Sequence, residues 1–329
     1  MKFSFKLLSA CAGFALSAVM AAAQTPTYEV TNRLIVGDIS KWDFTAFDAQ
    51  RNRLFLTRGD RVEAVDPKSG SVLGTIAGTQ GVHGVALAQD LKLGFTSNGK
   101  SNSVTVFNLD TLQITSEIQT HGENPDIILY EPITHKLFVF NGKTNNFDVI
   151  DTATLKVIAT IPASGRPEFA VSDEQGRIYF NVEDKSQINV IDIKTNQVVA
   201  KWQLKDCEEP TGLAMDVANA RLISTCKNKV AVVTNSKTGE YRARFAIGEH
   251  PDGVIYDAET KTVFVSNGDA GGTLTVVRQV NPDRYEVIEN LITSPGAKTM
   301  AMNPTTKQVY LPTVLNGQFT VLVVAKKAF

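Results

Sequence analysis

Residues 125–162 read PDIILYEPITHKLFVFNGKTNNFDVIDTATLKVIATIP, and this stretch decides the fold. It holds four short runs rich in Ile, Val, Leu and Phe, separated by the polar segments EPITHK, NGKTNN and DTATLK. Short apolar runs bounded by Asn, Asp, Gly and Pro are typical of β-strands joined by tight turns. The stretch therefore predicts one four-stranded antiparallel sheet.

The same plan recurs along the chain. Seven units can be aligned, and their starts lie 40, 43, 42, 43, 41 and 46 residues apart. The units open at Trp42–Asp43, Val82–His83, Pro125–Asp126, Pro167–Glu168, Pro210–Thr211, Pro251–Asp252 and Ala297–Lys298. Four strands repeated at this period indicate a propeller blade. We therefore predict an all-β, seven-bladed β-propeller.

The last unit ends at FTVLVVAKKAF, directly after its third strand, so its fourth strand is missing. Near the N-terminus, Tyr28–Ile35 reads YEVTNRLI and matches YEVIENLI, the fourth strand of unit six at Tyr285–Ile292, at five of eight positions. We expect residues 27–36, approximately, to complete blade 7, because ring closure removes open sheet edges.

The first 23 residues predict a secretory signal peptide. Lys2 and Lys6 precede the apolar run Leu7–Met20, and three alanines offer a cleavage site before Gln24. An alternative is lipoprotein processing at Cys11, which follows Leu8-Ser9-Ala10. We expect one propeller domain over residues 24–329 that is periplasmic or secreted, monomeric and without a transmembrane segment.

Charge and cysteine content add two expectations. Residues 24–329 hold 31 of the 33 basic and all 34 acidic side chains, which gives no electrostatic indication of a nucleic-acid partner. Cys207 and Cys226 remain after the signal peptide, and an even pair in an oxidising compartment predicts a disulfide. The alternative is two unrelated buried thiols.

Several phrases resemble a known family of repeats. LGFTSNGKSNSVTVFNLDT at 93–111 and VFVSNGDAGGTLTVV at 263–277 resemble the bacterial YVTN-repeat propellers, also called YncE-like or surface-layer-type repeats. The resemblance covers residues 42–323, and units four and five depart from it with NVEDKSQ and STCKNK. It implies the propeller fold, in a family of binding, surface and accessory proteins.

The residue that opens each first strand is expected to face the channel mouth. That column reads Asp43, His83, Asp126, Glu168, Thr211, Asp252 and Lys298. Carboxylates held close together favour a bound cation or raised pKa values. The alternative is a solvated tunnel mouth, in which the charges are simply hydrated.

Turns on the same face add Asn141, Asn181 and Asn267, whose oxygens suit Ca²⁺, although Asn in turns more often serves backbone geometry. Asp126, Glu168 and Asp252 are the tentative calcium ligands. No two histidines are spaced as an HxH or HExxH pair, which disfavours a dedicated transition-metal site.

HPDGVIYDAETKTVFVSN at 250–267 also resembles calcium-dependent lactonase propellers of the gluconolactonase class. That resemblance implies that Asp252 binds calcium and acts as a base, whereas Glu168 and Thr211 depart from the asparagines common in that class. GxSxG, P-loop, Rossmann and CxxCH motifs are missing from the sequence. We therefore expect a non-catalytic propeller that binds a small polar ligand, peptide or protein, with the lactonase as the alternative.

Overall fold

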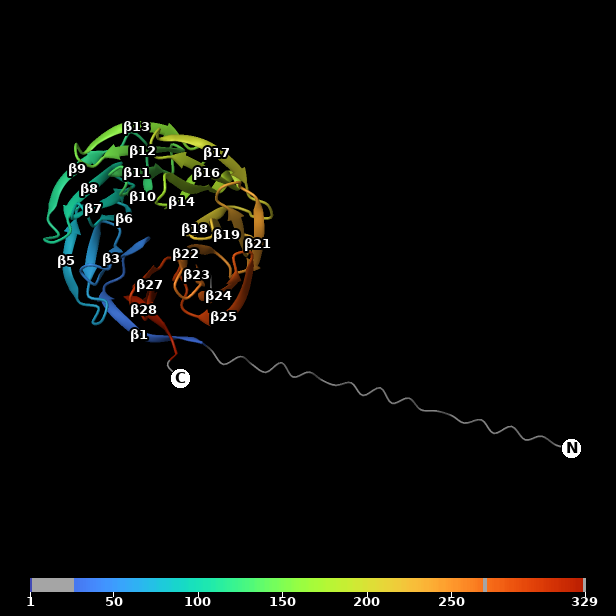
Figure 1. Ribbon diagram of the computed structural model, residues 1–329. Helices are drawn as coiled ribbons and strands as arrows, with labels where there is room; N and C mark the ends of the chain where they lie inside the picture. Colours follow the sequence, from blue (N-terminus) through green and yellow to red (C-terminus); the bar gives the residue numbers. More distant parts are fainter. Residues whose placement is uncertain (2–26, 269–270, 328–329) are drawn as a thin grey trace.

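The chain forms a closed ring of seven four-stranded antiparallel sheets (Figure 1). The computed structural model describes Met1, residues 27–268 and residues 271–327. In these residues the only helical segment is the 3₁₀ turn η1 (Glu183–Lys185). The predicted all-β, seven-bladed propeller is confirmed. The predicted signal peptide and Cys11 lie outside the described residues, apart from Met1.

Six blades use four consecutive strands each, ordered from the channel outward (Figure 1). Blades 1 to 3 contain β2 (Thr45–Asp48), β3 (Arg53–Thr57), β4 (Arg61–Val65) and β5 (Val72–Ala77); β6 (Val82–Ala88), β7 (Leu93–Asn98), β8 (Ser103–Asn108) and β9 (Ile114–Gln119); and β10 (Pro125–Glu131), β11 (Lys136–Asn141), β12 (Asn146–Asp151) and β13 (Lys156–Pro162). Blades 4 to 6 contain β14 (Pro167–Ser172), β15 (Arg177–Val182), β16 (Gln187–Asp192) and β17 (Gln197–Gln203); β18 (Pro210–Asp216), β19 (Arg221–Cys226), β20 (Val230–Asn235) and β21 (Tyr241–Ala246); and β22 (Pro251–Asp257), β23 (Thr262–Asn267), β24 (Thr273–Asn281) and β25 (Arg284–Ile292).

Blade 7 combines the two ends of the chain. It contains β26 (Ala301–Met302), β27 (Val309–Leu315), β28 (Gln318–Lys326) and the N-terminal strand β1 (Tyr28–Gly37). In Figure 1 the blue strand β1 lies beside the red strands of blade 7. The two edge strands are antiparallel, with Tyr28 opposite Lys326. The predicted closure of the ring by residues 27–36 is therefore confirmed.

The start of β1 is also attached to blade 6. The amide groups of Thr27 and Tyr28 donate hydrogen bonds of 2.8 and 2.9 Å to Oε2 of Glu289 in β25. The Tyr28 ring packs edge-on against Phe264, with ring centroids 5.4 Å apart. The N-terminal strand therefore joins two blades.

The core is divided among the blade boundaries. Among the described residues, buried apolar side chains form seven clusters, and each cluster joins two neighbouring blades. Phe55 of blade 1, for example, packs on Phe107 of blade 2. Each boundary removes apolar surface from water, so the ring is stabilised by contacts all the way round.

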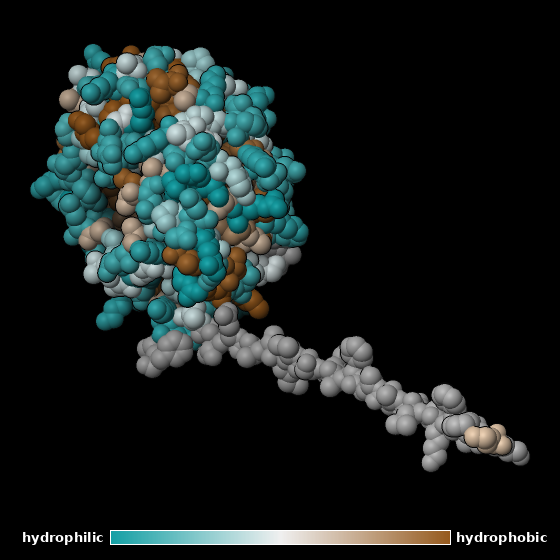
Figure 2. Space-filling model, turned by 45° about the vertical axis from the view of Figure 1, so that its right-hand side comes forward, coloured by the Kyte–Doolittle hydropathy of each residue, from teal (hydrophilic) through white to brown (hydrophobic). Residues whose placement is uncertain are grey.

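Polar residues cover most of the face seen in Figure 2, and hydrophobic residues form small separate patches there. The described residues include no helix that is both long and apolar enough to cross a membrane.

A disulfide lies beside the channel in blade 5. Cys207 precedes β18, Cys226 ends β19, and their sulfur atoms are bonded, with Cα atoms 5.3 Å apart. Both residues are buried in the cluster between blades 4 and 5. The cross-link therefore fixes the connection into blade 5 to the end of its second strand.

Candidate ligand-binding site at the channel mouth

A bulge positions the channel residue in five of the seven blades. In β10, Pro125 pairs with Asn141 and Ile128 pairs with Val139, so Asp126 and Ile127 together face one partner residue. Blades 2, 4, 5 and 6 have the same register shift. A bulge re-aims side chains next to it. The residues that follow the first residue of these strands are His83, Asp126, Glu168, Thr211 and Asp252.

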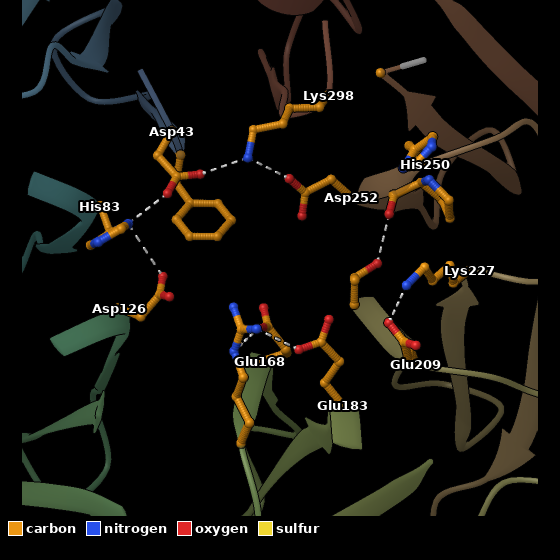
Figure 3. A pocket seen from close by; sticks show the side chains of 15 residues that line it. Asp43, His83, Asp126, Glu168, Glu183, Glu209, Lys227, His250, Asp252 and Lys298 are labelled. Atoms are coloured by element: carbon orange, nitrogen blue, oxygen red, sulfur yellow. Dashed lines mark hydrogen bonds and ion pairs between the residues drawn. The ribbon is translucent and has the colours of Figure 1, made fainter. Parts of the chain in front are cut away.

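The seven predicted channel residues line one cavity of about 700 Å³ (Figure 3). Asp43 and Lys298, from blades 1 and 7, precede the shorter first strands β2 and β26. Connections between strands add Arg166, Glu183, Glu209, Lys227, His250 and Gly268 to the lining. The side chains thus come from every blade of the ring.

An aromatic pair lies below the polar residues. Phe44 lines this cavity and also a smaller, more apolar one of about 180 Å³. Its ring packs edge-on against Phe169, with centroids 4.7 Å apart. The channel mouth is therefore a cup with charged walls and an aromatic residue at its floor.

Lys298 connects two carboxylates on one wall of the cup. Its Nζ lies 2.9 Å from Oδ2 of Asp252 and 3.5 Å from Oδ1 of Asp43 (Figure 3). Burial lowers the pKa of Lys298, but the charges of Asp252 and Asp43 outweigh burial and raise it above its usual value. Burial raises the pKa of Asp252, and Lys298 opposes that shift. Lys298 therefore stays a cation.

His83 lies between two carboxylates on the adjoining wall. Its Nδ1 is 2.7 Å from Oδ2 of Asp43 and 3.7 Å from Oδ1 of Asp126 (Figure 3). Burial by itself lowers the pKa of His83, but the hydrogen bond to Asp43 and the two negative charges outweigh it, so the pKa is raised. These three groups come from blades 1, 2 and 3.

Asp126 and Glu168 are the most buried carboxylates of the cup. Their residues are 8% and 7% exposed, and within the described residues neither carboxylate accepts a well-formed hydrogen bond. Burial raises the pKa of Asp126 to about 6, although His83 opposes the shift. Burial, reinforced by Asp126, raises the pKa of Glu168 to about 9. Each of these carboxylates has a cationic neighbour, His83 for Asp126 and Arg166 for Glu168, and that neighbour offsets only part of the effect of burial.

The opposite wall holds three further ion pairs, made by two cations. Nε and Nη1 of Arg166 lie 3.2 Å from Glu168 and 2.9 Å from Glu183, respectively. Nζ of Lys227 lies 2.6 Å from Glu209. Burial raises the pKa of Glu183, and Arg166 opposes that shift. The cations on this wall are therefore already shared among carboxylates.

The three predicted asparagines do not line the cup. Asn141, Asn181 and Asn267 are at most 1% exposed. The Asn181 amide donates to the carbonyl oxygens of Thr211 and Gly212, at 2.9 and 3.0 Å, in the next blade. The amides of Asn141 and Asn267 donate to residues of their own blades, so we correct the prediction that these three side chains face a ligand.

Thr211 lines the cup, but its hydroxyl group serves the backbone. It donates a 2.8 Å hydrogen bond to the carbonyl oxygen of Pro251. Among the calcium ligands predicted from the sequence, Asp252 is paired with Lys298 and Glu168 with Arg166. A different set lies closest together, since one ligand atom each of Asp43, His83 and Asp126 lies within 4.8 Å of the others.

Sequence reasoning missed several lining residues. Arg166 and Glu209 each directly precede the proline that opens a first strand. Asn124 and His250 occupy the same place in their repeats, and Glu209, Asn124 and His250 have φ values of 43°, 56° and 48°. The repeated residue–Pro pair was therefore an available signal for a second ring of mouth residues.

Solved structures similar to this chain share its fold over nearly its whole length. A chain of Kuenenia stuttgartiensis hydrazine synthase is 16% identical, with a TM-score of 0.75 over 94% of this chain and 100% of that chain. The WD40 repeats of RRP9 are 9% identical, with a TM-score of 0.79 over 91% and 99%. A chain of the mitotic checkpoint complex is 12% identical, with a TM-score of 0.78 over 96% and 99%.

These comparisons define the class of the protein as a seven-bladed β-propeller with WD40-like structural neighbours. No protein-family model and no curated protein matches the chain. The resemblance to YVTN repeats therefore stays a prediction. At these sequence identities, the likeness to solved structures concerns the fold alone.

Proposed function

We propose that this chain is a non-catalytic binding propeller whose channel mouth holds a positively charged group. The group would be the ammonium or guanidinium of a small polar ligand, or of a side chain presented by a peptide or protein partner. The observation that carries the proposal is the charge of the cup. Six carboxylates line it against three Lys and Arg side chains, besides two histidines.

The shape of the cup supports a compact ligand. About 700 Å³ lies within the range of small-molecule pockets, and the Phe44 ring at the floor offers an aromatic surface. A cation placed on an aromatic ring gains a favourable electrostatic interaction. Carboxylate walls above an aromatic floor therefore suit an amine better than an anion or a neutral sugar.

The state of the carboxylates supports the same ligand. Asp126 and Glu168 are largely buried, and although His83 and Arg166 oppose the shift, their pKa values are raised to about 6 and about 9. A bound cation would favour their ionised forms. Binding near neutral pH should therefore release a proton, because the Glu168 carboxyl exchanges its proton for the ligand charge.

Partner and localisation follow from other features. WD40-type propellers serve widely as interaction scaffolds, and one structural neighbour is part of an assembly, the mitotic checkpoint complex. A partner that inserts one basic side chain would satisfy the cup.

We further propose that the mature protein is a monomer that acts in the periplasm or outside the cell, on the basis of the predicted signal peptide and the disulfide.

The lactonase alternative depends on Asp252 as a calcium ligand and base. Its carboxylate instead lies 2.9 Å from Lys298, a cation that competes with calcium for the same oxygen. We therefore favour binding over hydrolysis.

The proposal can be tested by thermal unfolding with matched pairs of ligands. Nα-acetylarginine amide, spermidine and a lysine-containing peptide with a blocked N-terminus should raise the Tm, whereas Nα-acetylcitrulline amide and the same peptide acetylated at its lysine should not. Glu168→Gln and Glu183→Gln should reduce the response, and Glu117→Gln, on the outer strand β9, should keep it. A response that neutral analogues reproduce, or no response to any cation, would refute the proposal.

A further inference from the structure

We propose that Asp43, His83 and Asp126 form a binding site for one divalent transition-metal ion such as Zn²⁺. The inference does not rest on the proposed function, because the ion would occupy one wall of the cup and would not use Glu168 or Glu183.

The geometry of the three ligand atoms suits such an ion. One oxygen or nitrogen of each residue lies within 4.8 Å of the other two, and Nδ1 of His83 lies 2.7 and 3.7 Å from the two carboxylates. Tetrahedral zinc–ligand bonds of about 2.0–2.2 Å place neighbouring donors roughly 3.3–3.6 Å apart. Side-chain shifts of less than about 1 Å would bring all three donors to one ion.

The three residues are held by different blades. The Asp43 amide donates to Oγ1 of Thr57 at 2.9 Å, and the Asp43 carbonyl accepts from Thr299 at 2.6 Å. His83 and Asp126 sit in the bulges of β6 and β10. A ligand set held by two strands and a hydrogen-bonded segment next to a third strand is well preorganised.

The backbone orients the imidazole. The ring of His83 lies against Gly99, where a Cβ would be only 2.7 Å from Nε2. Nε2 therefore faces the backbone, and Nδ1 faces the two carboxylates. Only a glycine allows the ring this position without a shift of neighbouring atoms.

Asp126 is the least compensated of the three carboxylate and imidazole ligands. The residue is 8% exposed and lines the cavity, and in the described part of the chain no group donates a hydrogen bond of normal length to its carboxylate. The nearest charged partner is Nδ1 of His83, at 3.7 Å. The carboxylate is open to the cavity, so a metal ion could reach it and would compensate its charge.

The donor set indicates the kind of metal. Calcium and magnesium prefer sites made of oxygen ligands, whereas imidazole nitrogen suits zinc and its transition-metal neighbours. Lys298 binds the other oxygen of Asp43, and Asp252 in turn compensates Lys298, so the lysine leaves Oδ2 of Asp43 available. Three protein ligands leave a coordination position open toward the cup.

The three proposed metal ligands are not spaced along the sequence as HxH or HExxH pairs are. HxH and HExxH pairs place ligands on one strand or one helix turn, whereas these ligands are 40 and 43 residues apart and come from successive repeats. The ring brings equivalent positions of neighbouring blades together.

Calorimetry with Zn²⁺ on the full chain, after treatment with a chelator, tests the inference. We expect one equivalent of Zn²⁺ to bind, and His83→Gln and Asp126→Asn each to weaken binding at least tenfold. Glu168→Gln, in the same cup, should change the affinity less than twofold. His135→Gln, whose imidazole faces Asp90 at 3.2 Å outside the cup, should also have no effect.

A second measurement covers the case in which a variant fails to fold. On addition of equimolar Zn²⁺ to the wild-type chain, the NMR signals of one imidazole out of four should shift, and assignment should identify His83. The inference is overturned if no Zn²⁺ binds, if both cup variants bind it as the wild type does, or if a different histidine responds. Loss of amine binding in Glu168→Gln would leave the Zn²⁺ result unchanged.

Discussion

Nζ of Lys298 lies 2.9 Å from Oδ2 of Asp252, and this ion pair joins blade 7 to blade 6 at the channel mouth. The same ammonium group reaches Asp43 of blade 1 at 3.5 Å. One lysine therefore compensates two carboxylates, whereas among the described residues Asp126 has only His83 and Glu168 has only Arg166 as a cationic neighbour.

Lys298→Met should destabilise the protein because it leaves Asp43 and Asp252 without their cation. We expect the free energy of unfolding to fall by about 1–2 kcal/mol at pH 7. This is below the range for fully buried ion pairs, because the Lys298 side chain is 41% exposed. The loss should shrink at low pH, where Asp252 is protonated. Urea denaturation measures it, and a Lys298→Met/Asp252→Asn double mutant should lose less than the sum of the single mutants. Additive losses would contradict the pairing.

Glu168→Gln should stabilise the ligand-free protein at alkaline pH. The pKa of Glu168 is raised from 4.5 to about 9, so the folded chain holds this proton more tightly than the unfolded chain does. The contribution of Glu168 to stability therefore falls as the pH rises from about 4.5 to 9, and a glutamine avoids this loss. One pKa unit corresponds to about 1.4 kcal/mol, so we expect Glu168→Gln to raise the free energy of unfolding at pH 9 by at least that amount.

The control for this prediction is Glu117→Gln, on the exposed outer strand β9. Denaturation at pH 5 and pH 9 should give a gain for Glu168→Gln that grows with pH and no such trend for the control. A gain independent of pH would mean that Glu168 is ionised in the folded cup.

Glu289→Ala should loosen the closing strand. Oε2 of Glu289 accepts hydrogen bonds from the amides of Thr27 and Tyr28 and from the hydroxyl group of Thr27. Loss of these bonds should cost about 1–3 kcal/mol and speed amide exchange in β1 more than elsewhere. Glu286→Ala, in the same strand but paired with exposed arginines, is the matched control. Equal exchange of β1 in both variants would show that Glu289 does not hold the strand.

Replacing both Cys207 and Cys226 with alanine should lower stability without opening the ring. The bridged residues are 19 positions apart, and a cross-link over a loop of this length is worth about 3 kcal/mol. The midpoint of urea denaturation should fall in the double variant, and reduction of the wild type should give the same shift. Two free thiols in protein from an oxidising compartment would contradict the disulfide.

The fold could be predicted from the sequence because its information is local and repeated. Each unit of about 40 residues shows its strands and turns, and the match of Tyr28–Ile35 with Tyr285–Ile292 identifies the strand that closes the ring. Strand pairing within a blade needs only short connections, so a regular period carries most of the topology.

The site could be predicted only in part. The column of residues that opens each first strand does line the cup, since each has the same place in its repeat. The asparagines failed because the strand register decides where they point: Asn141 pairs with Pro125 and turns into its own blade. Pairings such as Lys298 with Asp252 depend on the curvature of the ring and on side-chain reach, which a repeat pattern does not contain.

Isothermal titration of the strongest-binding amine from the thermal panel, in two buffers of different ionisation enthalpy at pH 7.5, tests the central claim most directly. We expect binding at one site with release of up to one proton, since the Glu168 carboxyl must ionise. Changing Asp126, Glu168 and Asp252 together to Asn, Gln and Asn should abolish binding. Absence of binding by every amine, or equal binding by this triple variant, would contradict the claim that the acidic cup is the ligand site.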